Sequence, residues 1–387
     1  MSGLADLLGD LSSAEFACDV WGREARVIDG VPTRFAGLIA SSDIDRILRF
    51  VRPQAPRDMM LVKASKHFDA NWIDADGAPR SDQVRAAWEQ GFSIVLNDVA
   101  RYWEPVARFC AALQADLHHP VDANLYLTPP GTQGFDPHYD VMDVFVLQLE
   151  GAKQWSLWDA GADRPLADEH RAVDPARLPA PRWSEMLVAG QVLYIPRGGV
   201  HAARATDVAS LHLTIGVKVV TWLDLIAAAG QGARDDRRFR DALPPGFLGN
   251  AHGLDEAMAE RVAAVVPYLT ATAGVAGLAK RLLDAAPLPR DDLLAPKGDL
   301  DLQSLLVRRD GVICTVAADP TQAVLRYNGG ILVGPAKIGP AISWIAAEPR
   351  WRPTDLPALA DKERLVLANR LLREGLVERV IERGGDC

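Results

Sequence analysis

Three side chains in this sequence have the types and the spacing of a metal centre. His138 and Asp140 form a His-x-Asp pair, and His201 follows sixty-one residues after Asp140. Two imidazoles and one carboxylate are the ligand set of the facial triad that holds non-haem Fe(II) and leaves other positions open for oxygen chemistry. Because His-x-Asp alone is a common pattern, the interpretation depends on the surrounding elements.

The segments around these residues have the alternation and the breakers of β-strands. Side chains at i and i+2 of a strand share a face, so His138 and Asp140 are predicted to bind one ion from a single strand. His201 follows the predicted strand 191–195 after a Gly-Gly turn. Further strands are expected at 123–128, 141–149, 153–158 and 210–220. Many short strands with Pro/Gly turns predict a sandwich or barrel, and a double-stranded β-helix of the cupin (jelly-roll) kind fits.

A cation lies on the strand that follows the His-x-Asp pair. Lys153 stands between small, polar and aromatic residues in 151–155. An ammonium group inside an apolar barrel is costly unless it is paired, and the distal carboxylate of a 2-oxo acid would pair with it. A zinc or nickel cupin is the chemical alternative, because the same ligands accept several divalent metals. A zinc site would leave Lys153 without a role.

Other histidines compete for the second imidazole position. His212 lies in a continuous strand with apolar neighbours, and we interpret it as a core histidine whose hydrogen bonds are satisfied. His118 and His119 are interpreted as a surface or strand-entry pair.

Length, composition, charge and cysteine content limit the class of protein. With 387 residues, the chain is expected to form two or three domains. Its composition, 49% hydrophobic and 24% charged, is that of a globular protein. A net charge of −9 gives no excess of positive charge that would predict nucleic-acid binding. The four cysteines form no CxxC and are expected to be free thiols. The sequence starts without signal-peptide features and has no long apolar run, so we expect a cytoplasmic protein.

Helices are predicted on both sides of the strand-rich region. Residues 42–49 and 101–117 are candidates before it, and 256–264 and 270–283 carry apolar residues every three or four positions after it. Near the end of the chain, a hairpin is predicted within 311–335 with its turn at 328–330, and a helix over 362–372 is predicted to stop at Gly375. The predicted fold class is mixed α+β.

The residues around the predicted site carry a family resemblance. The segments that carry it are, in chain order, 124–135, 137–140, 143–148, 151–155 and 194–201. They resemble the JmjC-type ribosomal oxygenases, the cupin-4 branch of the Fe(II)/2-oxoglutarate hydroxylases. Residues 16–30, with Trp21, and residues 351–377 extend the likeness toward both ends of the chain.

The resemblance implies a domain plan and a ligand set. It implies a JmjC catalytic domain at 1–220, a helical dimerisation domain at 221–295 and a winged-helix-like domain at 296–387, in a homodimer. By match of position, His138, Asp140 and His201 would bind Fe(II), and Lys153 would hold the carboxylate of the cosubstrate 2-oxoglutarate. Asn124 and Thr214 would lie near the cosubstrate, and Met142 and Tyr126 are assigned to the substrate pocket. No catalytic residue beyond these ligands is predicted.

Two positions depart from the family pattern. Met142 stands where a His or Tyr is expected, and Gly216 stands where some members carry a small hydroxyl residue. The implied function is hydroxylation of a protein side chain, His or Arg of a ribosomal protein. Met142 motivates the alternative, a related oxygenase acting on a peptide natural product or small molecule, and a non-catalytic cupin module is a third hypothesis. Residues 301–387 hold 12 Lys/Arg against 11 Asp/Glu, so no direct DNA binding is expected.

Overall fold

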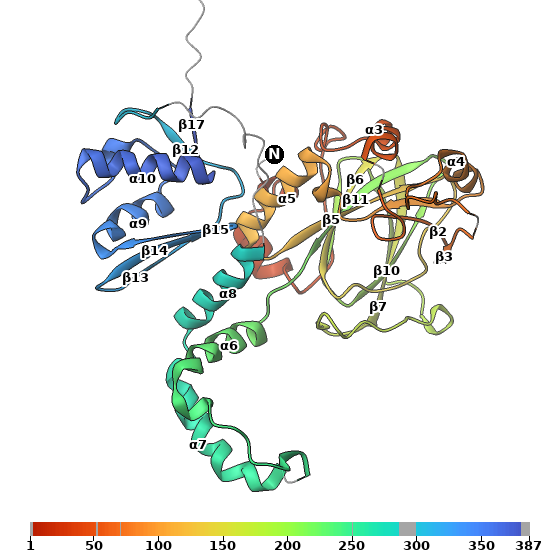
Figure 1. Ribbon diagram of the computed structural model, residues 1–387. Helices are drawn as coiled ribbons and strands as arrows, with labels where there is room; N and C mark the ends of the chain where they lie inside the picture. Colours follow the sequence, from red (N-terminus) through yellow and green to blue (C-terminus); the bar gives the residue numbers. More distant parts are fainter. Residues whose placement is uncertain (1–2, 52, 70, 250, 286–298, 381–387) are drawn as a thin grey trace, which may run out of the picture. The chain divides into compact units, whose positions relative to one another are not determined.

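A computed structural model describes residues 3–51, 53–69, 71–249, 251–285 and 299–380, which fall into two compact units, 1–219 and 220–387. Both units mix helices and strands (Figure 1). The first unit ends one residue before the boundary predicted at 220. The boundary predicted at 295 lies outside the described residues, as does Cys387.

An eight-stranded sheet forms the centre of the first unit. Its strands lie, in spatial order, as β1 (Arg26–Ile28), β9 (Val192–Ile195), β6 (Asp143–Glu150), β11 (Ser210–Val217), β5 (Val121–Thr128), β4 (Ser93–Leu96), β2 (Met59–Lys63) and β3 (Lys66–His67). All of their pairings are antiparallel. The predicted strands at 123–128, 141–149, 191–195 and 210–220 correspond to β5, β6, β9 and β11, which are neighbours in one sheet.

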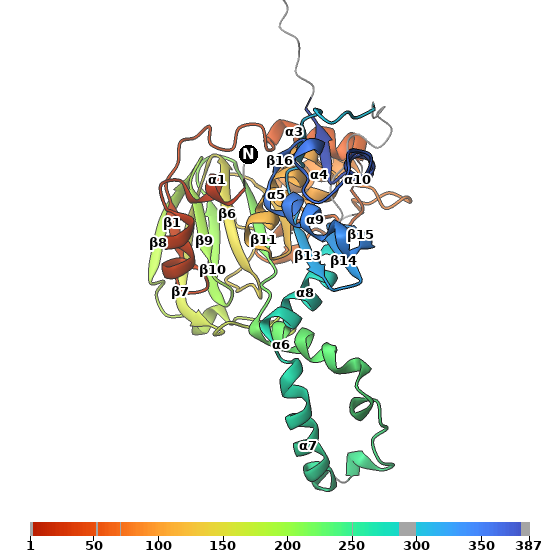
Figure 2. The ribbon, with the colours of Figure 1, turned by 90° about the vertical axis from the view of Figure 1, so that its left-hand side faces the viewer.

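Helices cover one face of this sheet (Figures 1 and 2). The helices of the first unit are α1 (Leu4–Leu8), α2 (Ser13–Glu15), α3 (Ser41–Arg46), α4 (Ser81–Glu89) and α5 (Glu104–Leu117). Buried side chains of α1 and α5, among them Leu7, Phe109 and Leu113, share one core cluster with Phe145 and Leu147 of β6. The helix expected at 101–117 is present and begins three residues later, where Pro105 occupies its first turn.

A smaller sheet packs against the opposite face. It consists of β10 (Gly199–Ala205), β7 (Ala152–Gly161) and β8 (Trp183–Val188), in that order. Because successive side chains of a strand alternate between faces, Val144 and Val146 of β6 point away from the helices. They join Trp155 and Leu157 of β7 in a second apolar cluster between the two sheets. The cavity described below lies between these sheets.

The second unit begins with helices. They are α6 (Trp222–Gly230), α7 (Asp255–Val265) and α8 (Ala271–Ala285). Thr221 and Asp224 form a capping box that starts α6, which packs against α8. The contact is close, since a Cβ on Gly274 of α8 would lie 2.8 Å from the carbonyl oxygen of Leu225. The helices predicted at 256–264 and 270–283 correspond to α7 and α8.

The rest of the second unit has its own core. It holds a sheet of β16 (Arg350–Trp351), β12 (Leu306–Arg308) and β17 (Val377–Arg379), and a sheet of β13 (Cys314–Ala318), β14 (Gln322–Tyr327) and β15 (Gly330–Pro335). These pack with α9 (Gly339–Ala347) and α10 (Asp361–Glu374). The predicted hairpin and its turn correspond to β14 and β15. Gly375 ends α10 at φ +81°, as predicted.

In the described part of the chain, Cys18, Cys110 and Cys314 are free, as expected. No single described helix has the length and apolar character to cross a membrane, although one bent pair of helices passes by length and composition alone.

Candidate metal centre and cavity

The structure brings His138, Asp140 and His201 together. One ligand atom from each lies within 4.8 Å of the others. The Nε2 atom of His201 is 3.7 Å from Asp140 Oδ2, and the two imidazole centroids are 4.5 Å apart. His201 is buried, whereas Asp140 is about one-third exposed. These distances match a site in which three side chains meet at one face of an ion.

The backbone that creates this site differs from the prediction. His138 and Asp140 are not in a continuous strand: His138 forms an isolated bridge with His201, and Asp140 lies in the following irregular segment before β6. His201 follows β9 after a turn, as predicted, and lies within the next strand, β10. Two backbone hydrogen bonds, from His138 N to His201 O (3.1 Å) and from His201 N to His138 O (2.8 Å), hold the imidazoles side by side.

Backbone carbonyl groups set the tautomer of both histidines. The Nδ1 atom of His138 is 2.8 Å from Asp136 O, and that of His201 is 3.0 Å from Gly199 O. A carbonyl oxygen only accepts, so both Nδ1 atoms must carry the proton and both Nε2 atoms are left with a free lone pair. Burial, followed by the nearby His138, lowers the pKa of His201, which keeps the imidazole in the neutral form that binds a metal.

A cavity of about 630 Å³ opens onto the three ligands. Its wall includes every other predicted site residue except Met142: Asn124, Tyr126, Lys153 and Thr214. This volume lies in the range of small-molecule sites in proteins. Asn124 and Thr214 face each other across the paired strands β5 and β11, which places both on the strip of sheet next to the metal ligands.

Lys153 is buried at the inner end of this cavity. Its Nζ donates to Thr128 Oγ1 at 2.9 Å, and Ser93 Oγ donates to the same oxygen at 3.1 Å. No described carboxylate forms an ion pair with Lys153, and burial lowers its pKa to about 7. The sequence did not single out Thr128 or Ser93, because their approach to Lys153 depends on the pairing of β4 with β5 and on the stacking of the two sheets.

The prediction that His212 is a core histidine with satisfied hydrogen bonds is wrong in part. His212 is buried as predicted, and its ring stacks on Tyr126 with the centroids 4.7 Å apart. Its hydrogen bonds, however, are not satisfied: Nδ1 has no partner among the described residues, and His212 lines the cavity. Nε1 of Trp155, another lining residue, also lacks a partner there. Unpaired polar atoms therefore cluster around Lys153, where a polar ligand would satisfy them.

Met142 does not line this cavity in the described structure, contrary to the prediction. The chain bends at residues 141–142 before β6 starts, so the alternation expected from Asp140 to Met142 is interrupted. Met142 packs instead against the cluster between the sheets. A Cβ placed on Gly216 would collide with its Sδ and would lie 2.6 Å from Asp122 Oδ1. The two departures from the family pattern are thus one feature, because Met142 fills the space above Gly216.

Gly216→Ser is therefore expected to destabilise the fold by about 1–3 kcal/mol through overpacking against Met142. The double variant Met142→Ala/Gly216→Ser should recover most of this loss, giving a favourable coupling energy in a double-mutant cycle. Urea unfolding of the four proteins measures it. A Gly216→Ser protein as stable as its parent, or strictly additive effects, would show that the two positions are independent.

Comparisons with known proteins agree with this geometry. The family model of the JmjC domain matches residues 99–225, a range that contains all three predicted ligands. Ribosomal oxygenase 1 of Gallus gallus is 31% identical over 303 residues, which is 73% of this chain and 48% of that protein. The bifunctional lysine-specific demethylase and histidyl-hydroxylase NO66 of Drosophila yakuba is 33% identical over 216 residues, 54% of this chain and 31% of that protein. The chain spans less than half the length of these curated relatives.

Solved structures share the fold along nearly the whole chain. The X-ray structure of ycfD from E. coli superposes with a TM-score of 0.59 at 18% identity and covers 96% of this chain and 98% of its own. YcfD, a ribosomal oxygenase from Escherichia coli in complex with cobalt and 2-oxoglutarate, gives a TM-score of 0.57 at 17% identity with the same coverage. Residues 99–225 thus match the JmjC domain, and the chain is similar to the ribosomal oxygenases in sequence and to YcfD in fold.

Proposed function

We propose that this protein is an Fe(II)- and 2-oxoglutarate-dependent oxygenase that hydroxylates a His or Arg side chain of a ribosomal protein. The observation that carries the proposal is that a three-ligand cluster and a buried lysine without a carboxylate partner share one cavity. The names of the relatives support the same chemistry, since they include a histidyl-hydroxylase and a ribosomal oxygenase bound to 2-oxoglutarate.

The residues present fit both the metal and the cosubstrate. Two neutral imidazoles with free Nε2 atoms and one carboxylate suit a divalent first-row metal. At the inner end, the Lys153 ammonium would pair with the distal carboxylate of a 2-oxo diacid, and the unpaired Nδ1 of His212 is a further polar atom that this ligand would satisfy. A zinc site would use the same three ligands, but it would give Lys153 and His212 no ligand to bind.

Each group of this chain then has a defined task. His138, Asp140 and His201 would hold Fe(II), and Lys153, with Thr128 behind it, would orient the distal carboxylate of 2-oxoglutarate. Bound together, the iron and 2-oxoglutarate supply oxygen activation, with the 2-oxo acid leaving as succinate and CO2. The apolar wall formed by Val144, Val146 and Trp155 keeps water from the reacting end of the cavity.

The substrate side chain would enter from the open side of the cavity. Tyr126, Phe135 and Asn124 line the cavity together with residues of the connection between β7 and β8, such as His170. Tyr139, between two proposed ligands in the sequence, anchors this connection: its hydroxyl donates to Glu169 O and accepts from Arg171 N. The alternative substrate, a peptide natural product or small molecule, rested on Met142, which does not line the cavity.

Mass spectrometry of ribosomal proteins tests the proposal. Ribosomal proteins incubated with the enzyme, Fe(II) and 2-oxoglutarate should gain 16 Da on one His or Arg, about the mass of one oxygen atom. The gain should be absent with the His138→Ala protein. Robust conversion of 2-oxoglutarate to succinate without a hydroxylated ribosomal residue would keep the reaction class and overturn the substrate.

The domain plan is part of the proposal. The two sheets of the first unit would be the halves of a double-stranded β-helix, and the strands and helices of 299–380 would form the winged-helix-like domain. The helices α6 to α8 would form the dimerisation domain. They and the segments between them expose large apolar side chains: Trp222, Leu223, Ile226, Leu248, Met258 and Val262 are each more than half exposed. Exposed apolar side chains in this number favour a protein interaction surface in this region.

A double variant in this region should separate the subunits. Leu248→Glu/Met258→Glu is expected to convert a dimer to a monomer at micromolar concentration, weakening association by about two orders of magnitude or more, because it buries charge in an apolar contact. Light scattering coupled to gel filtration measures the mass. Val333→Glu, an exposed apolar position on β15, is the matched control and should stay dimeric. A wild-type protein that is monomeric at these concentrations would contradict the prediction.

A further inference from the structure

A second pocket lies on the other side of the turn that leads to His201. Its volume is about 340 Å³, and it shares no lining residue with the metal cavity. Three parts of the chain form most of its wall: residues 22, 23 and 25, the end of β7 with the residues that follow it, and the turn 195–200; Arg182, just before β8, completes it. Ala162 N donates to Gly198 O at 3.2 Å, which joins two of these walls.

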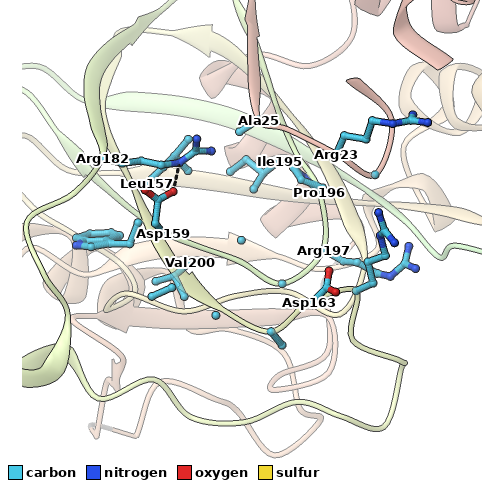
Figure 3. Close-up of a pocket in the computed structure, with 18 residues that line it drawn as sticks. Arg23, Ala25, Leu157, Asp159, Asp163, Arg182, Ile195, Pro196, Arg197 and Val200 are labelled. Carbon is cyan, nitrogen blue, oxygen red and sulfur yellow. Dashed lines mark ion pairs between the residues drawn. The ribbon is translucent and has the colours of Figure 1, made fainter. Parts of the chain in front are cut away.

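Four arginines from distant positions line this pocket: Arg23, Arg164, Arg182 and Arg197. Against them stand Asp159 and Asp163, so the lining has a net charge of +2, the difference of four and two, in a chain whose net charge is −9. Figure 3 shows Arg23 and Arg197 on one side of the pocket and the pair of Arg182 with Asp159 on the other. A local excess of positive charge in an acidic protein indicates an anion as the partner.

The arginines differ in whether they already form an ion pair with a carboxylate. Arg182 pairs with Asp159 at 3.1 Å, and the largely buried Arg197 pairs with buried Asp143 at 3.5 Å. Arg23 donates only to the backbone carbonyls of Ala17 and Trp21. Within the described ranges, no carboxylate pairs with Arg23 or Arg164. These two guanidinium groups are therefore available for a ligand, and Arg197, fixed by Asp143, gives the pocket a rigid positive wall.

We propose that this pocket binds a small ligand that carries a phosphate group. Guanidinium groups recognise phosphate and carboxylate through paired N–H donors. A tetrahedral phosphate offers oxygens in several directions and up to two negative charges, which suits arginines from three walls and a net charge of +2 better than a planar carboxylate does. The concave shape and the volume favour a small molecule, because nucleic acid is usually met by a basic stripe along a surface.

The position of the pocket couples a bound ligand to the metal centre through the backbone of one turn. Gly198 N donates to Asp140 O at 2.8 Å, and Gly199 O accepts from His201 Nδ1. Both glycines also line the pocket. A phosphate held by Arg197 would therefore restrain the same turn that orients two proposed metal ligands. Occupation of the pocket is expected to tighten metal binding, and by linkage the metal is expected to tighten phosphate binding by the same factor.

Calorimetric titration of the full chain with pyrophosphate at low ionic strength tests the proposal. One equivalent should bind, and the affinity should fall about tenfold or more in Arg164→Gln and in Arg23→Gln, since each loses a charge-assisted contact. Arg177→Gln, an exposed arginine of the same connection that does not line the pocket, should bind as the parent does. Both test positions are exposed, so the variants are expected to fold, and thermal unfolding checks this.

Four results would overturn the proposal. The first is no binding at millimolar pyrophosphate, and the second is equal weakening in Arg177→Gln, which would indicate unspecific charge attraction. The third is a short single-stranded RNA that binds more tightly than pyrophosphate and loses affinity in the same two variants, which would assign the pocket to a nucleic-acid backbone. Succinate serves as the carboxylate probe, and tighter binding of succinate than of pyrophosphate that is lost in Arg23→Gln and Arg164→Gln would also count against a phosphate site.

Discussion

Asp140→Ala is expected to weaken divalent metal binding by about two orders of magnitude or more and to reduce 2-oxoglutarate turnover to background. The variant would leave two imidazoles and no negative charge at the site, and even the loss of residues that only support a ligand costs 10- to 100-fold. Anaerobic titration with Co(II), followed by its visible absorption, measures metal affinity independently of activity. His201→Ala should behave in the same way, since it removes another of the three clustered ligand atoms.

The control for this experiment is His170→Ala. His170 lines the same cavity but lies outside the three-residue cluster, so its removal should leave Co(II) affinity unchanged even if substrate binding suffers. Metal binding that survives in Asp140→Ala, or that is lost equally in His170→Ala, would contradict the assignment of the ligands.

Lys153→Met is expected to weaken 2-oxoglutarate binding strongly while making the ligand-free protein more stable. The substitution removes the buried ammonium at the inner end of the cavity and keeps a similar volume. Binding to the metal-loaded protein should weaken by about a hundredfold or more, because a charge-assisted contact is lost and a carboxylate is left buried without a partner. Calorimetry of the Mn(II)-loaded protein without oxygen measures this affinity without turnover.

The stability of the ligand-free protein should depend on pH in a direction set by the same lysine. Burial lowers the Lys153 pKa to about 7, whereas a lysine in the unfolded chain titrates near pH 10.4. Below pH 7 the buried ammonium destabilises the folded state in full. Between these pH values the unfolded chain binds more protons than the folded one, so the contribution of Lys153 to stability becomes less unfavourable as pH rises. The Met variant should be more stable by on the order of 2 kcal/mol at pH 6, with the difference shrinking toward pH 10.

Urea unfolding of both proteins at several pH values tests this. Lys63→Met, at an exposed lysine on β2, is the control and should show no such pH-dependent gain. By the same argument, 2-oxoglutarate affinity in the parent should fall as pH rises above 7, since the dianion binds the protonated form of Lys153. A Lys153→Met protein that keeps its affinity, or that loses stability at pH 6, would rule out the proposed role.

The sequence by itself predicted the proposed chemistry and determined most of the local structure. Residue types at 138, 140, 201 and 153 were sufficient to predict a divalent metal with an anionic cosubstrate, and the family that these residues resemble is confirmed by the comparisons. Strands such as 192–195 and 210–217 were predictable because alternation, β-branched residues and Pro or Gly at the ends act locally. The role of each proposed ligand remains a prediction for the experiments above.

Only the tertiary structure decided which distant groups meet. The bridge between His138 and His201, the bend that moves Met142 away from the cavity to cover Gly216, and the unpaired Nδ1 of His212 all depend on how two sheets stack. The second pocket, lined by arginines, brings together residues 23, 164 and 197, whose spacing in the sequence follows no periodic pattern. Local sequence sets the direction of a side chain along its own strand, whereas the neighbours of that side chain are set by strand pairing and packing, which a single segment does not encode.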